Sequence, residues 1–101
     1  MVAINKESPT LLAAILVHWM NLEGHKILTA AMCIGVDEAT VCNWIMGRSL
    51  PNYDNIDRLA LCMCVSGLKI PYYEARQLVA DCVLFDKRQR RNRHESNNQR
   101  T

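Results

Sequence analysis

Residues 27–51 read ILTAAMCIGVDEATVCNWIMGRSLP, and the spacing of their small and apolar side chains decides the fold. Ala31 is followed four residues later by Gly35, and then by Val41 and Trp44, which lie three residues apart. Two short helices that cross steeply need a small residue at the crossing, such as Ala31, and a turn residue that accepts positive φ, such as Gly35. Val41 and Trp44 share one face of the second helix. The stretch therefore predicts two packed helices joined by a tight turn.

Apolar residues at helical spacing extend this pattern in both directions. Ser8 and Pro9 are typical of the N-cap and first position of a helix. Asp37 is placed to cap the second helix of the central pair, and Asp54 the helix that follows. Pro71 opens a last, amphipathic helix. The helices are expected to span about residues 9–22, 26–33, 37–46, 54–65 and 71–85.

Composition favours one small helical domain. The chain has 101 residues, of which 50% are hydrophobic, and this is enough for a small helical core. The longest apolar run, residues 11–17, is too short to span a bilayer, and the N-terminus does not resemble a signal peptide. Five cysteines without a C-x-x-C pair favour reduced, buried thiols in the cytoplasm.

No catalytic chemistry is expected. The sequence offers no paired carboxylates, no Ser-His-Asp set and no glycine loop that would hold a phosphate, so we do not predict an enzyme. We also expect no cofactor and no metal ion, because Cys62 and Cys64 would point to different faces of one helix.

Half of the positive charge lies near the C-terminal end. Residues 1–86 hold six basic and nine acidic side chains, a formal charge of −3, whereas residues 87–101 hold six basic and one acidic, a charge of +5. This segment, KRQRRNRHESNNQRT, has no apolar side chain to bury and is expected to be disordered. Its charge favours contact with a polyanion such as nucleic acid.

The central residues resemble the helix-turn-helix of the Cro/CI-type regulators, also called the XRE family. In that family the second motif helix runs into a Gly-basic-x-x-Pro loop and then an apolar helix. Residues 47–51, GRSLP, and the apolar spacing of residues 56–63 match this order, so that the resemblance covers about residues 10–66. A narrower resemblance, in the order of helices and basic tail, is to the lambda-type phage activators that establish lysogeny.

The resemblance implies an all-α, lambda-repressor-like bundle of four to five helices. Residues 1–8 would be a flexible leader, 9–66 the DNA-binding domain, 67–86 an oligomerisation helix and 87–101 the disordered basic tail. The protein would be a sequence-specific transcriptional regulator of a phage, plasmid or bacterium, cytoplasmic and associated with the nucleoid. Its partners would be double-stranded DNA, further copies of the chain in a dimer or tetramer, and RNA polymerase.

In this family the second motif helix enters the major groove. Asn43 is the strongest candidate to read a base, because an amide can pair bidentately with adenine. Thr40 suits a phosphate or a thymine methyl group, and Arg48, in the following loop, suits a phosphate. Asp37 and Cys42 also lie at positions of this helix that match contact positions in the family. The expected DNA-binding residues are Lys26, Glu38, Ala39, Thr40, Asn43, Met46, Arg48, Lys87, Arg88, Arg90, Arg91 and Arg93.

The last expected helix carries an apolar stripe with two possible interpretations. It is either the last layer of the core of one chain or a seam between two copies. The seam is favoured, because four helices already complete a core and regulators of this type bind two half-sites. The stripe consists of Tyr72, Ala75, Leu78, Val79, Cys82 and Phe85.

The charges also suit a second hypothesis, in which the protein is an interaction module. The expected recognition helix has no Arg or Lys and opens with Asp37 and Glu38, and a part of charge −3 neutralises few phosphates. In this alternative the helix-turn-helix is a scaffold whose acidic face binds a basic partner, while the tail binds nucleic acid without choosing a sequence.

Overall fold

The computed structural model describes the backbone of residues 9–99 and the side chains of residues 9–91, and this part of the chain is all helical, without strands. The expected all-α class is thereby confirmed. None of the described helices is long and apolar enough to cross a membrane. The helices are α1 (Leu11–Glu23), α2 (Ile27–Ile34), α3 (Glu38–Ile45), α4 (Tyr53–Val65) and α5 (Tyr72–Gln99).

The start of α1 is set by a threonine cap. The Thr10 hydroxyl accepts a hydrogen bond from the backbone N–H of Ala13 at 2.9 Å, so the helix begins at Leu11 rather than at the expected Pro9. A threonine at this position satisfies one of the first-turn N–H groups, which have no partner within the helix. Ser8, the expected cap, lies outside the described residues.

The start of α4 also differs from the prediction. Asn52, and not Asp54, takes the N-cap position, and its side-chain oxygen accepts from the N–H of Asn55 at 2.9 Å. Asp54 lies instead in the first turn, where its negative charge complements the positive end of the helix. Both residue types are good caps, so local preference alone did not separate them.

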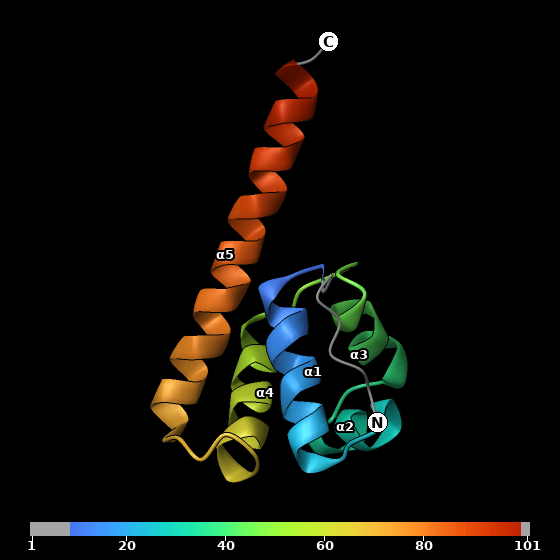
Figure 1. Cartoon of the computed structure of the whole chain (residues 1–101), viewed down its shortest axis with the longest axis vertical. Helices are drawn as coiled ribbons and strands as arrows, with labels where there is room; N and C mark the ends of the chain where they lie inside the picture. Colours follow the sequence, from blue (N-terminus) through green and yellow to red (C-terminus); the bar gives the residue numbers. More distant parts are fainter. Residues whose placement is uncertain (1–8, 100–101) are drawn as a thin grey trace.

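The helices bury one continuous core. Figure 1 shows α1 between α4 and α5 on one side and α2 and α3 on the other. Ala31, Val41 and Trp44 are buried, and Gly35 has a φ of 86°, as the spacing in residues 27–51 predicts. Trp19 of α1 is fully buried, and its indole N–H donates to the carbonyl of Ser66 at the end of α4 at 2.9 Å, which ties α1 to α4.

The last helix is much longer than expected. α5 has 28 residues and continues through residues 87–99, projecting beyond the other helices (Figure 1). The predicted end near Phe85 is wrong, and the structure gives a helix where a disordered tail was expected. The physical reason is local, because the segment is rich in the good helix formers Arg, Lys and Gln and has no Gly or Pro to end the helix. Residues 100–101 lie outside the described part.

The inner face of α5 belongs to the core of a single chain. Ala75, Val79 and Cys82 are at most 5% exposed, because α5 packs along α4 and α1. These three residues therefore cannot form the expected seam between two copies, and the alternative interpretation, a last core layer, holds for them. Of the six stripe residues, only Tyr72, Leu78 and Phe85 are more than a third exposed.

Candidate nucleic-acid interface

The turn between α2 and α3 is fixed by hydrogen bonds from two directions. The N–H groups of Gly35 and Val36 both donate to the carbonyl of Ala31, at 2.8 and 3.0 Å. From α4, the Arg58 guanidinium donates to the carbonyl of Gly35 at 3.1 Å, and the Cys62 thiol donates to that of Cys33 at 3.1 Å. These bonds satisfy carbonyls at the end of α2 that have no partner within the helix. The relative position of α2 and α3 is thus tied to α4.

Lys26 precedes the first turn of α2. Its N–H donates to the Thr29 hydroxyl at 2.9 Å, and that hydroxyl donates back to the Lys26 carbonyl at 3.0 Å. The Lys26 side chain is exposed. It therefore adds a positive charge beside a helix N-terminus, which itself favours anions.

The outer face of α3 contains several of the predicted contact residues. Asp37 occupies the N-cap position, although its side chain makes no capping hydrogen bond. Glu38, Ala39 and Met46 are exposed, and Thr40, Cys42 and Asn43 are half-buried. Because Val41 and Trp44 face the core, helical geometry places Ala39, Asn43 and Met46 together on the opposite side. This face combines one amide with small and apolar groups and has no positive charge.

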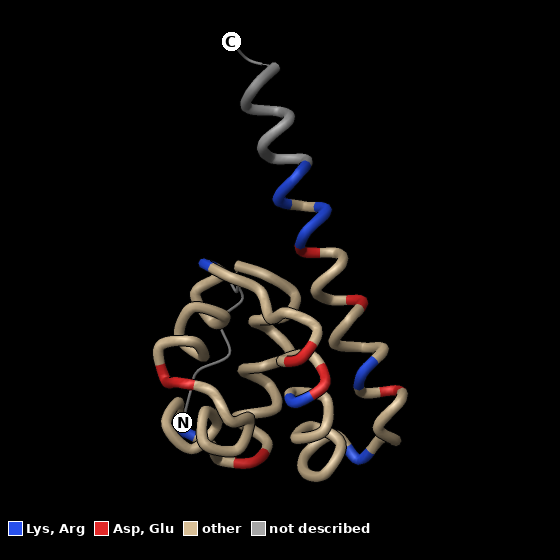
Figure 2. Tube along the Cα trace, turned by 180° about the vertical axis from the view of Figure 1, so that it is seen from behind, with Lys and Arg blue, Asp and Glu red and all other residues tan. Residues whose placement is uncertain are grey.

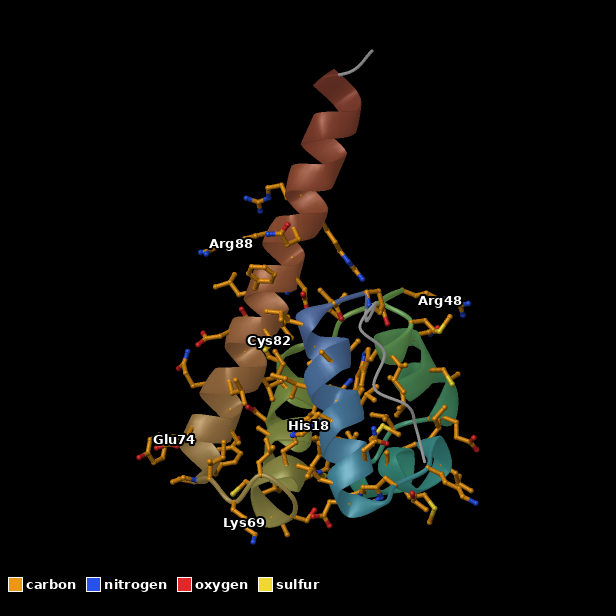
Figure 3. The ribbon with its side chains drawn as sticks, viewed as in Figure 1. His18, Arg48, Lys69, Glu74, Cys82 and Arg88 are labelled. Carbon is orange, nitrogen blue, oxygen red and sulfur yellow. The ribbon has the colours of Figure 1, made fainter. Side chains whose placement is uncertain are left out.

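The loop after α3 continues directly from the helix. The N–H groups of Arg48 and Ser49 donate to the carbonyl of Asn43, at 2.9 and 3.4 Å. Gly47 has a φ of 74°, which a side chain would disfavour. Arg48 itself is exposed, and Figure 3 shows its side chain projecting away from the body of the molecule. The exposed cation therefore lies at the C-terminal end of α3, next to the outer face.

The densest group of described positive charges lies on the far part of α5, which carries four of the nine described Lys and Arg side chains. Figure 2 shows Lys and Arg gathered on α5 where it leaves the other helices. Lys87, Arg88 and Arg91 are exposed there, whereas the side chain of Arg93 lies outside the described part. We call Lys87, Arg88 and Arg91 the α5 extension. It supplies the charge that α3 lacks.

Two charged side chains hold α5 in place. Asp86 is only 4% exposed, and its carboxylate accepts from the N–H groups of Leu11 and Leu12, each at 2.9 Å. One turn later, the Arg90 guanidinium donates to the carbonyl of Gly47 at 2.5 Å. Arg90 was predicted to bind DNA, but its guanidinium is engaged within the chain.

Two cysteines behave as core residues. Burial, followed by the interactions with Cys33, raises the pKa of Cys62 to about 12. Burial, followed by the negative charges of Asp86 and Asp81, raises the pKa of Cys82 to about 11. Both thiols are therefore protonated at neutral pH and are poor nucleophiles. Within the described residues, no group of His, Cys, Asp and Glu is arranged to hold a metal ion.

The comparisons with protein-family models, curated proteins and solved structures found no match.

Sequence reasoning missed the residues that connect the helices. Arg58 and Cys62 bond to carbonyls 23 and 29 residues away, and Asp86 caps a helix 75 residues away. Only Asp86 carries a signal in the sequence, because it follows Val79 and Val83 at helical spacing and so falls on the buried stripe. An acid in an apolar stripe predicts a buried partner, although not which one.

Proposed function

We propose that the protein is a sequence-specific DNA-binding transcriptional regulator of the Cro/CI type, in which α2 and α3 form a helix-turn-helix and α3 enters the major groove. One observation carries the proposal. The face of α3 opposite Val41 and Trp44 exposes Ala39 and Met46 beside Asn43, and it ends in a loop that exposes Arg48. A polar group that can read a base thus lies next to a cation that can bind a phosphate.

The charge distribution assigns different roles to α3 and α5. With no basic residue, α3 contributes little to phosphate neutralisation, which supplies most nonspecific DNA affinity. Lys26 and Arg48 provide two contacts near the groove, and the α5 extension provides further positive charge. In this proposal α3 supplies selectivity, and the cations supply most of the affinity and its dependence on salt.

The proposal includes self-association, because a dimer reads two half-sites with two copies of one helix. Since Ala75, Val79 and Cys82 lie in the core, the contact between copies would use Leu78 and Phe85, which are 37% and 46% exposed. RNA polymerase would be a further partner on the nucleoid of a bacterial or phage-infected cell.

One observation favours a second candidate function, the interaction module. Asp37 and Glu38 are exposed at the start of α3 and make no ion pair with any cation whose side chain is described. Carboxylates at this place repel the phosphates that a recognition helix approaches. In this alternative they attract a basic protein surface, and the α5 extension binds nucleic acid of any sequence.

Selection from a random duplex library distinguishes the two functions. The library would be presented to the full chain and to a full-length variant with Lys87→Gln, Arg88→Gln and Arg91→Gln, which leaves Asp86 and Arg90 in place. If α3 reads DNA, both proteins enrich the same motif, the variant at lower salt. If the wild-type chain enriches no motif and the variant binds no duplex, the regulator proposal fails and the interaction module is favoured.

A further inference from the structure

The loop between α3 and α4 is held from two sides. On one side the start of α1 packs against Gly47, so closely that a Cβ atom placed on Gly47 would lie 2.8 Å from the Cβ of Pro9 and 3.4 Å from the Cγ2 of Thr10. On the other side Arg90 of α5 donates to the Gly47 carbonyl. The loop therefore has neighbours from both ends of the described chain.

The two charged residues on the inner face of α5 match the helix ends that they contact. The Asp86 carboxylate lies at the N-terminus of α1, where the free N–H groups carry partial positive charge. The Arg90 guanidinium lies just beyond the C-terminus of α3, where the carbonyls carry partial negative charge. Since the two residues are one helical turn apart, both contacts require the same placement of α5.

Holding the Gly47 carbonyl also holds Arg48. The peptide group between these residues contains the Gly47 carbonyl and the Arg48 N–H, and it is planar. Its carbonyl accepts from Arg90, and its N–H donates to the Asn43 carbonyl at 2.9 Å. Both polar groups of this peptide are thus fixed, one by α5 and one by α3.

We propose that Arg90 is a positioning residue that fixes the loop carrying Arg48 at the end of α3, and that it does not itself bind phosphate. The consequence for DNA binding rests on the proposed function, whereas the fixing of the loop does not. An arginine suits this task, because its planar group remains charged and presents several donors in a fixed geometry.

Arg88 provides a matched control. Arg88 lies two residues after Asp86 and two residues before Arg90. It is therefore on the opposite face of α5 from both. Figure 3 shows its side chain pointing away from the rest of the molecule, on the far side from Arg48. It is exposed and forms no hydrogen bond or ion pair with a described side chain. Arg88→Gln therefore removes the same charge from the same helix without touching the loop.

Amide hydrogen exchange of the full chain, measured by NMR without nucleic acid, tests the fixing of the loop. We expect Arg90→Gln to speed exchange at the Arg48 and Ser49 amides about fivefold to tenfold, because the loop opens more often. Arg88→Gln should leave these rates at the wild-type value. Equal rates in the two variants would overturn the proposal, whatever the protein binds.

A double-mutant cycle in duplex binding tests the consequence. If Arg90 acts by positioning Arg48, Arg90→Gln weakens binding severalfold in the wild-type chain but has little further effect in a chain that already carries Arg48→Gln. An equal loss with and without Arg48 would mean that Arg90 contacts phosphate itself, and it would overturn the proposal. If the wild-type chain binds no duplex at all, the proposed function fails, and hydrogen exchange still decides whether Arg90 fixes the loop.

Discussion

Asn43 is the residue on which selectivity most depends, because it is the only amide side chain on the outer face of α3. If its amide pairs with a base, Asn43→Ala should weaken binding to the selected sequence by about 1–3 kcal/mol and leave binding to random duplex nearly unchanged. Asn55→Ala is the matched control, a half-buried asparagine on α4. Fluorescence anisotropy with both duplexes measures the difference. Equal loss on both duplexes, or no loss, would remove Asn43 from the recognition surface.

The raised pKa of Cys62 makes the free energy of unfolding depend on pH in the alkaline range. The folded protein holds this thiol proton more tightly than the unfolded chain, since the pKa is about 12 against an ordinary 9.0. The contribution is therefore fully present below pH 9 and is lost as the pH rises toward 12. Urea unfolding between pH 8 and 11 should show a falling free energy of unfolding, with a shallower fall in Cys62→Ala. Parallel curves for the two proteins would contradict the assigned burial.

At the scale of single residues, the sequence predicts which side chains are buried better than it predicts which groups form hydrogen bonds between helices. Ala31, Gly35, Val41 and Trp44 could be placed because each follows from helical spacing or from a turn that needs positive φ. The donation from Arg58 to Gly35 could not be placed, because nothing in the periodicity of one helix reports which carbonyl of another helix it reaches.

At the scale of elements, Asp86 joins the first helix to the last. Asp86→Ala would leave the Leu11 and Leu12 N–H groups without an acceptor, and we expect a loss of about 2 kcal/mol in the free energy of unfolding. Asp81→Ala is the matched control, because Asp81 lies exposed on the same helix, and its hydrogen bond from Gln77 is local. Thermal or urea unfolding measures both. A loss no greater than in Asp81→Ala would mean that Asp86 does not cap α1.

The ends of α5 show why boundaries are harder to predict than helices. The amphipathic stripe predicts a helix from about residue 71, and it begins at Tyr72. The stripe stops at Phe85, and a prediction based on burial stops there too. Helix propensity continues through the arginine-rich segment, however, and no glycine or proline interrupts it. The lack of apolar residues after Phe85 therefore does not predict where the helix ends.

At the scale of the whole molecule, the surface that would read DNA and the largest group of positive charges lie on different helices. The α3 face that would read DNA is uncharged or acidic, and the densest group of described cations is the α5 extension (Figure 2). Neutralising Lys87, Arg88 and Arg91 together should flatten the slope of log K against log salt by up to about 2.7, if each neutralises one phosphate. Binding measured from low to moderate salt gives the slope. An unchanged slope would mean that the α5 extension does not touch DNA.

The most direct test of the central claim is an NMR titration of the full chain with duplex DNA at low salt, following the backbone amides. If α3 is the recognition helix, the largest shifts fall on residues 38–48, with smaller ones near Lys26 and along the α5 extension. Shifts confined to residues 87–91, with α3 unchanged, would contradict the account and leave the protein as a polyanion binder whose α3 has another partner.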